Sequence, residues 1–217
     1  MKLYKYIALE HLDDAIKYGI YASKLTEVND PYEAYNIKYP ENYRICCMTK
    51  SDKSMLMWSY YKGHTGCRVQ YEISDELFSK GIVRKVVYER FRKNRFTITE
   101  DKISEMLYHK GYEWNHEKEY RAVWDANSYD NDYWEMVSKE DGSTKTFLKC
   151  KAVSVTFGYL SCRNKQYANA LELLKNINDN IKYRKDQIIV KRCELSDKKY
   201  MLIYDNQFNY LEELARL

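Results

Sequence analysis

The chain has little glycine and little proline: only 7 Gly and 2 Pro stand among its 217 residues. Collagen-like, linker-like and broadly disordered chains need far more of both and fewer apolar residues, whereas 45% of this chain is hydrophobic. Long apolar runs are also absent, because the stretch at residues 152–157 falls far short of the about 18 residues that a spanning helix needs. These absences favour a packed globular protein without a membrane partner.

The N-terminal segment lacks the apolar core of a secretory signal, since Glu10, Asp13 and Asp14 follow closely on the first residues. We therefore expect the protein in the cytoplasm. Cysteines are present, but none has Cys-x-x-Cys spacing or a histidine at zinc-finger distance, so we expect free thiols and no metal site. The six are Cys46, Cys47, Cys67, Cys150, Cys162 and Cys193.

Several diagnostic motifs are missing as well. The sequence contains no Gly-x-Ser-x-Gly, Gly-x-x-x-x-Gly-Lys-Ser/Thr, Gly-x-Gly-x-x-Gly or His-Glu-x-x-His. This argues against hydrolase elbows, P-loop nucleotide hydrolysis, Rossmann cofactors and zinc proteases.

Charge is nearly balanced, with 36 Lys+Arg against 32 Asp+Glu and a formal net charge of +4. Such a balance permits an anionic partner without requiring one. Aromatic residues are abundant at 15%, led by 23 Tyr. A tyrosine buries its ring and keeps its hydroxyl hydrated, which favours a packed domain with adhesive surfaces.

Periodicity predicts a mixed architecture. Helical spacing begins at Leu12, with Gly19 as the C-terminal cap, and recurs at residues 54–61, 99–111 and 165–177. Strand patterns occupy residues 3–7, 20–23, 44–48, 67–73, 83–88, 119–124 and 152–157, with a closing hairpin of 188–193 and 200–204. The polar residues 127–143 suggest a flap. We expect one α+β domain, residues 1–217, with a central, largely antiparallel sheet and short flanking helices.

Two polar segments are candidates for chemistry. The loop Asn29-Asp30-Pro31-Tyr32-Glu33 is either an ordinary turn or a rigid loop that presents Asp30 or Glu33 to a ligand. In the segment 114–121, a strand would place Glu117, Glu119 and Arg121 on one face. That arrangement suits either a site with an ionised carboxylate beside a cation or a solvated salt bridge.

Two further segments are candidates for binding. The aromatic residues of 57–66, ending in a Gly-bounded turn with His64, can stack on a planar ring near a phosphate, or they form an aromatic helix in the core. Residues 90–96 interleave positive charges with Phe91 and Phe96, which is typical of either a nucleic-acid footprint or a solvated basic loop. The charges are those of Arg90, Arg92, Lys93 and Arg95.

A series of short motifs resembles a known family. The motifs are Leu3-Tyr4-Lys5-Tyr6, Tyr21-Ala22-Ser23, the 29–33 loop, Met57-Trp58-Ser59-Tyr60-Tyr61, His64-Thr65-Gly66, Glu117-Lys118-Glu119-Tyr120-Arg121 and Val155-Thr156-Phe157-Gly158. In this order they resemble the bacterial domain-of-unknown-function family numbered 2971, over roughly residues 3–204. Cys67-Arg68-Val69 departs from the more apolar strand start of that family, which concerns local packing.

The order of elements is also similar to small bacterial ADP-ribosyltransferase toxins that modify nucleic acid. This resemblance implies that NAD is the substrate, without a metal, and that Glu119 stabilises the oxocarbenium-like transition state. Glu117 would be its neighbour, and Arg121 would keep Glu119 ionised or bind pyrophosphate. The implied NAD contacts are Tyr4, Lys5, Tyr6, Trp58, Tyr60, Tyr61 and His64, with Asn29 and Asp30 at the rim.

Three functions remain open. The leading hypothesis is an NAD-dependent ADP-ribosyltransferase-like enzyme of a phage-defence or toxin system, which modifies nucleic acid or protein and has a neutralising antitoxin-type partner. The second is a non-enzymatic module that binds a nucleotide or nucleic acid through its aromatic residues and the basic run. The third is a metal-dependent nuclease using Asp30, Glu117 and Glu119, although the sequence shows no arrangement specific to a hard cation.

Overall fold

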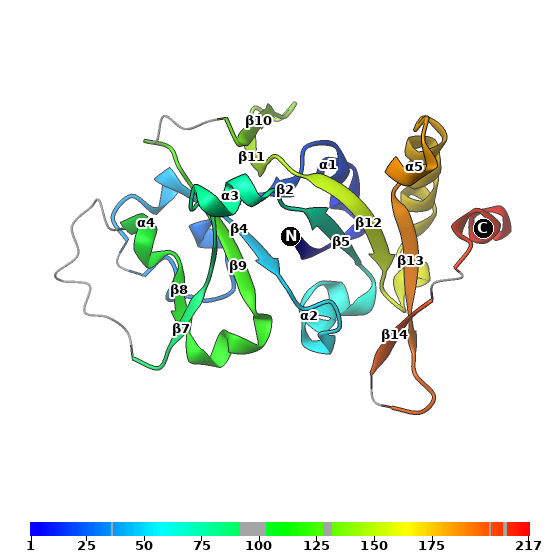
Figure 1. Cartoon of the computed structure of the whole chain (residues 1–217), viewed down its shortest axis with the longest axis horizontal. Coiled ribbons are helices and arrows are strands. Elements are labelled where there is room, and N and C mark those ends of the chain that lie inside the picture. Colours follow the sequence, from blue (N-terminus) through cyan, green and yellow to red (C-terminus); the bar gives the residue numbers. More distant parts are fainter. Residues whose placement is uncertain (36, 92–102, 128–131, 200, 206–207) are drawn as a thin grey trace. The chain divides into compact units, whose positions relative to one another are not determined.

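The computed structural model describes residues 1–35, 37–91, 103–127, 132–199, 201–205 and 208–217 (Figure 1). In these ranges the protein is α+β, with short helices and strands that pair mostly antiparallel. The predicted fold class is therefore confirmed. The chain forms two compact units: unit 1 contains Met1, Tyr18–Lys50 and Ile73–Cys150, and unit 2 contains Lys2–Lys17, Ser51–Glu72 and Lys151–Leu217. The single domain over residues 1–217 stays a prediction.

The longest strand pairing in unit 1 joins residues Tyr43–Thr49 to Glu119–Asp125 in antiparallel register. Its strands are β2 (Ile20–Tyr21), β3 (Ser23–Lys24), β4 (Tyr43–Thr49), β6 (Val83–Lys85), β7 (Val87–Glu89), β8 (His109–Gly111), β9 (Glu119–Asp125), β10 (Trp134–Ser138) and β11 (Thr144–Leu148). Its helices are η2 (Leu25–Glu27), η3 (Pro40–Asn42), α3 (Asp75–Ser79), α4 (Ile103–Met106) and η7 (Tyr112–Glu117). β9 pairs with β4 and β6, β11 pairs with β10 and β2, and β7 runs parallel to β8.

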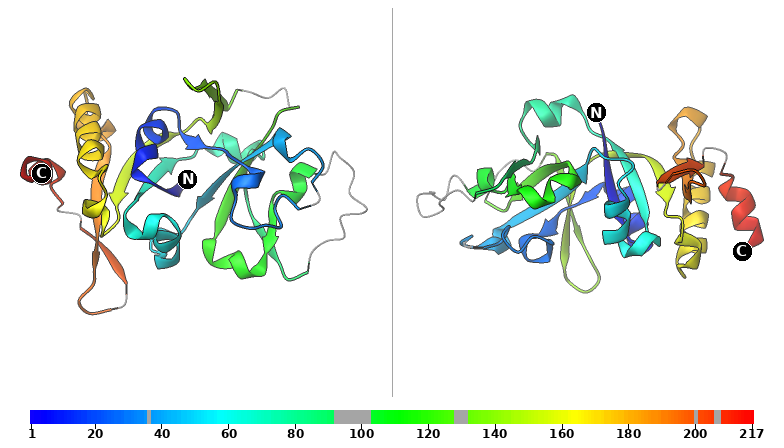
Figure 2. Two further views of the ribbon diagram at one scale, coloured as in Figure 1. Left: turned by 180° about the vertical axis from the view of Figure 1, so that it is seen from behind. Right: turned by 90° about the horizontal axis from the view of Figure 1, so that it is seen from below.

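Unit 2 is a sheet flanked by helices. The strand order is β14 (Leu202–Asp205), β13 (Ile189–Leu195), β12 (Lys151–Phe157), β5 (Cys67–Glu72) and β1 (Lys2–Ile7). Only β12 and β13 pair in parallel within it. Its helices are η1 (Leu9–His11), α1 (Leu12–Lys17), α2 (Met55–Tyr60), η4 (Lys62–His64), η8 (Ser161–Arg163), α5 (Tyr167–Asp179), η9 (Arg184–Asp186) and α6 (Tyr210–Arg216). Helix α5 connects the parallel pair and lies alongside it, with α6 next to α5 (Figure 2).

The two faces of the unit 2 sheet differ in chemistry. Because side chains alternate along a strand, Leu3, Val69 and Val155 share one face, and all three are fully buried. Tyr71 lies on this apolar face and its hydroxyl donates to the carbonyl oxygen of Ala15 on α1 at 3.1 Å. The opposite face carries polar side chains from β1, β5 and β12.

The predicted helix at residues 99–111 is wrong in its second half. Helix α4 spans only Ile103–Met106, residues 107–108 form a turn and 109–111 form β8, while 99–102 lie outside the described residues. The backbone explains the change, because Val87 N donates to Tyr108 O at 2.8 Å and β7 then pairs with β8. Tertiary pairing overrides the helical periodicity here.

Two other predicted strands are divided for a similar reason. The strand expected at 20–23 becomes β2 and β3, because Ala22 N donates to Thr146 O while the next residues pair with β4. The strand expected at 83–88 becomes β6 and β7, with Val86 N bonded to Glu119 O between them. The expected flap contains β10, which pairs with β11, and residues 128–131 of the flap lie outside the described ranges. The expected closing hairpin is present as β13 and β14.

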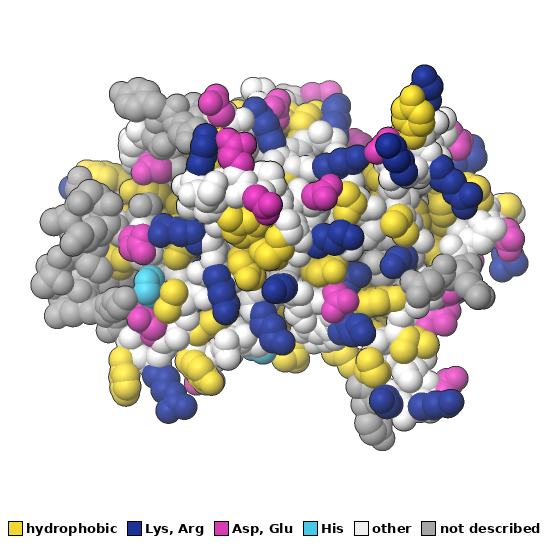
Figure 3. All heavy atoms as spheres, viewed as in Figure 1, with side chains coloured by type: hydrophobic (Ala, Val, Ile, Leu, Met, Phe, Trp, Pro, Cys, Tyr) yellow, Lys and Arg dark blue, Asp and Glu magenta, His cyan; other side chains and the backbone are white. Residues whose placement is uncertain are grey.

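The surface carries mixed charge. Figure 3 shows Lys and Arg side chains interspersed with Asp and Glu on the face that it displays. In the part of the chain that the structure describes, no helix is long and apolar enough to cross a membrane.

Candidate functional sites

Five ionisable side chains form a buried cluster in unit 1, called the charge cluster below: Glu33, Lys110, Glu117, Glu119 and Arg121, each with a side chain at most 7% exposed. Lys110 Nζ lies 2.6 Å from Glu117 Oε2 and 3.4 Å from both Glu33 Oε1 and Glu119 Oε2. Arg121 holds Glu119 through two contacts, Nε–Oε1 at 2.8 Å and Nη2–Oε2 at 2.9 Å, and its Nη2 reaches Glu33 Oε1 at 2.7 Å. The structure thus brings together two segments that the sequence left separate.

The 29–33 loop delivers Glu33 to this cluster. Asp30 Oδ1 accepts from Tyr32 N at 2.9 Å, and Glu33 N donates to Asp30 O at 3.1 Å, which are the bonds of a tight turn. Asp30 is buried and Asn29 is exposed. The predicted turn is therefore present, and its consequence is that a carboxylate enters the interior of unit 1.

Glu117 joins the cluster from outside the strand, which corrects the prediction that it shares a strand face with Glu119 and Arg121. It is the last residue of η7, and Lys118 adopts a left-handed conformation at φ 48 before β9 begins. Thr49 Oγ1 donates to Glu117 O at 2.6 Å and fixes this corner. The alternation prediction holds for Glu119 and Arg121, which are both buried on β9.

Opposing effects of burial and charge move the carboxyl pKa values of Glu117 and Glu119 in opposite directions. Burial favours the protonated form of both. In Glu119 the positive charges of Arg121 and Lys110 outweigh burial and hold the pKa of its carboxyl below its ordinary value. In Glu117 burial dominates over the attraction of Lys110, so the pKa of its carboxyl is raised. One carboxylate is thus kept ionised while its neighbour is moved toward protonation.

Lys110 is the cluster residue that the sequence analysis missed, because it was placed in a predicted helix. Burial disfavours its charge, but the carboxylates of Glu119, Glu33 and Glu117 outweigh burial and raise the pKa of its ammonium group. The ring of Trp114 lies 4.6 Å from its Nζ. Its ammonium contacts Glu117 and Glu119, two of the three carboxylates that the nuclease hypothesis assigns to a divalent cation, whereas the third, Asp30, accepts from Tyr32 N within its own turn.

We expect acid to destabilise the protein through Glu119. The folded-state pKa of this group is lower than its ordinary value of 4.5, so its ionised form stabilises the fold above that pH, and the stabilisation is lost as pH falls toward the folded-state pKa. The raised pKa of Glu117 acts in the opposite sense, because its contribution is lost as pH rises. Urea unfolding between neutral and acid pH measures both. In Glu119→Gln the free energy of unfolding should fall less steeply with decreasing pH than in the native chain. In Glu113→Gln, a substitution on the exposed side of η7, it should fall as in the native chain. The same decrease in the native chain and both variants would contradict the prediction.

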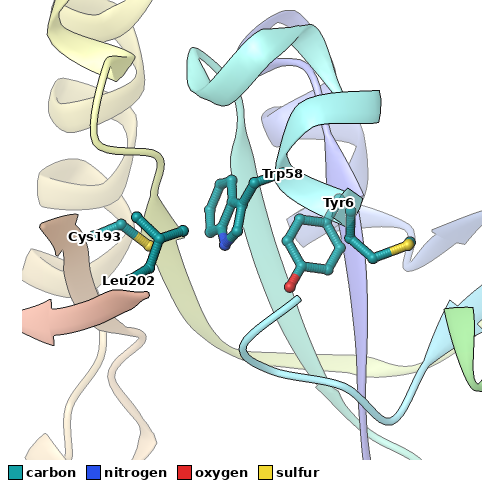
Figure 4. Close-up of a cluster of buried hydrophobic side chains, with 5 residues drawn as sticks. Tyr6, Trp58, Cys193 and Leu202 are labelled. Atoms are coloured by element: carbon teal, nitrogen blue, oxygen red, sulfur yellow. The ribbon is translucent and has the colours of Figure 1, made fainter. Parts of the chain in front are cut away.

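The predicted aromatic residues of unit 2 lie together, but largely inside its core. Tyr6 and Trp58 meet edge to face with ring centroids 4.9 Å apart, and Tyr61 stacks on Tyr6 at 6.2 Å. Trp58 is fully buried, and Figure 4 shows its ring between Tyr6 on one side and Cys193 and Leu202 on the other. Trp58 therefore packs as a core residue in this structure.

The end of α2 and the residues that follow it are more accessible. Tyr60 is 48% exposed. His64 Nε2 lies 3.3 Å from Ser59 Oγ, and its ring meets that of Tyr159 edge to face at 5.1 Å. Partial burial lowers the pKa of His64, so its neutral form is favoured. The NAD contacts predicted for these residues stay predictions.

The first strand carries Tyr4 and Tyr6 on the polar face of the unit 2 sheet, while alternation places Lys5 on the other face with Leu3. Between the tyrosines and β14 lies Arg68, which the sequence analysis treated only as a departure from a family pattern. Its Cζ is 4.6 Å from the ring centres of both Tyr4 and Tyr204. The signal that could have identified Arg68 was its position in a predicted alternating strand, opposite a strand rich in tyrosine.

The predicted nucleic-acid run is described only at its start. Arg90 is exposed and its guanidinium lies 5.3 Å from the ring centre of Tyr112, and Phe91 is 87% exposed. Arg92, Lys93 and Arg95 lie outside the described residues. The nucleic-acid footprint stays a prediction.

The six cysteines are free thiols. Burial raises the pKa of Cys67, Cys150 and Cys193, which makes these thiols poor nucleophiles. Among the side chains that the structure places, no group of three or more His, Cys, Asp or Glu is arranged to hold a metal ion.

Comparison with known proteins gives no match: no family model, no curated protein and no solved structure matches the chain. The resemblances to family 2971 and to ADP-ribosyltransferase toxins therefore stay predictions.

Proposed function

We propose that the chain is an ADP-ribosyltransferase-like enzyme that uses NAD as substrate, with the charge cluster of unit 1 as its reaction centre. One observation carries the proposal: two buried glutamates share Lys110, whose Nζ lies 2.6 Å from Glu117 and 3.4 Å from Glu119, and their carboxyl pKa values move in opposite directions, that of Glu117 upward by burial and that of Glu119 downward by Arg121 and Lys110. Carboxyl pairs separated in this way serve different roles in enzymes that act on glycosidic bonds. The bond between nicotinamide and ribose is of that kind.

The reaction balances with these residues. The bond between nicotinamide and C1′ of the ribose breaks, its electron pair stays on nicotinamide, and positive charge develops at C1′. Ionised Glu119 stabilises that charge electrostatically. The target's nucleophile then bonds to C1′ and releases its proton to the Glu117 carboxylate, which the raised pKa makes the stronger base. Arg121 acts as a positioning residue that holds both oxygens of Glu119.

Access is a requirement of the proposal. The side chains of Glu119 and Glu117 are 3% and 7% exposed, so a substrate reaches them only if covering side chains move. Trp114 is half-buried and lies over Lys110. Its displacement would open the Lys110 side of the cluster. The target, nucleic acid or protein, and a neutralising partner in a defence or toxin system belong to the same proposal.

The test is incubation of the purified protein with labelled NAD and bacterial lysate, followed by separation of free ADP-ribose, protein and nucleic acid. We expect label transfer by the native chain and a loss of about 10²- to 10³-fold in Glu119→Gln, because an electrostatic stabiliser of the transition state is removed. Glu117→Gln should slow transfer most above the raised pKa of Glu117, where the native carboxylate is ionised and accepts the proton, and least at low pH, where it is protonated in the native chain as well.

Glu113→Gln is the matched control, since Glu113 is exposed on the same 3-10 helix as Glu117. Circular dichroism of each variant separates loss of fold from loss of reaction. The proposal is rejected if the native chain neither releases nicotinamide nor transfers label. It is also rejected if the folded Glu119→Gln variant is fully active.

A further inference from the structure

Two arginines are buried in the described structure, and they differ in how their charge is matched. Arg121 in unit 1 is fully buried and binds two carboxylates, Glu119 and Glu33. Arg68 in unit 2 is 4% exposed, and in the described ranges it forms no ion pair. A buried charge without a counterion is costly unless something compensates it.

The protein partners of Arg68 are neutral, and the Tyr6 hydroxyl is among its neighbours: burial raises the pKa of Tyr6, and the charge of Arg68 and a side-chain hydrogen bond with it act to lower that pKa. Nη1 donates to the carbonyl oxygen of Asp52 and to the Tyr204 hydroxyl, the latter at 2.7 Å, and Nη2 donates to Thr156 Oγ1 at 3.1 Å. Nε is buried and has no hydrogen-bond partner in the described structure. Since a guanidinium has five N–H donors, Nε–H and one Nη2 hydrogen remain for an acceptor. A guanidinium with two donors left over can bind a phosphate through more than one N–H···O contact.

The aromatic neighbours add attraction without neutralising the charge. Tyr4 and Tyr204 both place a ring centre 4.6 Å from Cζ, which is within cation–π range. Burial raises the pKa of Tyr4, Arg68 lowers it, and Asp52 raises it to a smaller extent. The Asp52 carboxylate thus acts through space here, while its backbone oxygen makes the direct contact.

The surrounding sheet face is also polar. Arg68 is the register partner of Tyr6 on β1 and of Thr156 on β12, and the next pair on the same face is Gln70 with Ser154. Ser154 and Thr156 are 4% and 0% exposed. Three adjacent strands therefore present hydroxyl, amide and guanidinium groups on one side, next to the Tyr6 ring that packs against Trp58, and apolar side chains on the other.

We propose that this polar face of unit 2 binds the phosphate of a nucleotide. The free donors of Arg68 take two phosphate oxygens, with the Tyr204 and Thr156 hydroxyls beside them. The base stacks on the outward side of Tyr4, which is only half-buried, as bases stack on aromatic side chains elsewhere. Because Arg68 is nearly covered, the ring of Tyr4 turns outward when the phosphate enters. This site does not depend on the reaction proposed for unit 1.

Calorimetric titration with ADP tests the site, with inorganic pyrophosphate and adenosine as separate arms. ADP is not a donor for the proposed transfer, so the two proposals fail independently. We expect ADP to bind more tightly than either fragment. Arg68→Lys should weaken ADP binding by about tenfold or more, since lysine lacks the planar fork. Tyr4→Ala should weaken ADP binding but leave pyrophosphate binding almost unchanged.

Arg192→Lys is the matched control. Arg192 lies in the same unit, with its guanidinium 4.8 Å from the ring centre of Phe208, but Glu213 and Glu194 already pair with it at 3.3 and 3.5 Å. If Arg68→Lys fails to fold, Tyr4→Ala on the partly exposed ring still decides the matter. Absence of ADP binding, or adenosine or pyrophosphate binding as tightly as ADP, would overturn the proposal. So would unchanged ADP affinity in folded Arg68→Lys or in folded Tyr4→Ala.

Discussion

Arg121→Met is expected to reduce the free energy of unfolding by about 3–5 kcal/mol. The substitution keeps much of the side-chain volume but removes a fully buried cation that binds Glu119 twice and Glu33 once. Three carboxylates would then face Lys110 alone. Because small proteins are stable by only about 5–15 kcal/mol, the variant should be close to unfolding at neutral pH. Urea unfolding followed by circular dichroism measures the change.

Arg44→Met is the matched control in the same unit. Arg44 lies on β4, paired in register with Trp124 of β9, and its Nη1 donates to the carbonyl oxygen of Glu41. It is only half-buried and should contribute about 1 kcal/mol or less. Adding Glu119→Gln to Arg121→Met should recover part of the loss by removing an unpaired charge. A loss as small as that of Arg44→Met would show that the charge cluster contributes no net pairing energy.

Trp58→Ala is expected to reduce the free energy of unfolding by about 3–5 kcal/mol as well. The indole is fully buried between Tyr6, Cys193 and Leu202, and its removal leaves a large cavity where α2 meets the sheet of unit 2 (Figure 4). Urea unfolding monitored by circular dichroism is the measurement, because the substitution also removes a fluorophore.

Tyr60→Ala, two residues further along α2, provides the comparison. Its side chain is 48% exposed, so the loss should stay near 1 kcal/mol or below. The two variants, Trp58→Ala and Tyr60→Ala, also test the role of Trp58, for which the resemblance to ADP-ribosyltransferase toxins implies a contact with NAD. A stable Trp58→Ala protein that no longer uses NAD would restore the binding role, whereas a strongly destabilised one identifies a core residue.

Local patterns predicted the elements whose partners lie close in the sequence or whose periodicity is strong. Helix α2 spans Met55–Tyr60 against an expected 54–61, and α5 spans Tyr167–Asp179 against 165–177. The prediction failed over residues 107–111, where the pairing of β8 with β7 overrides helical spacing. The backbone hydrogen bonds of such a short strand come from a distant segment, which a local pattern does not contain.

The sequence by itself determined the α+β class, the turn at Asp30 and the residue types available for chemistry. Tertiary structure alone decided which of them meet: Glu33, Lys110 and Arg121 come from segments far apart in the chain and reach one another only after β8 and β9 are in place. It also decided that Trp58 is core and that Arg68 forms no ion pair among the described residues. The physical reason is that charge pairing and burial depend on distances in space, whereas composition and periodicity record only which side chains can take part.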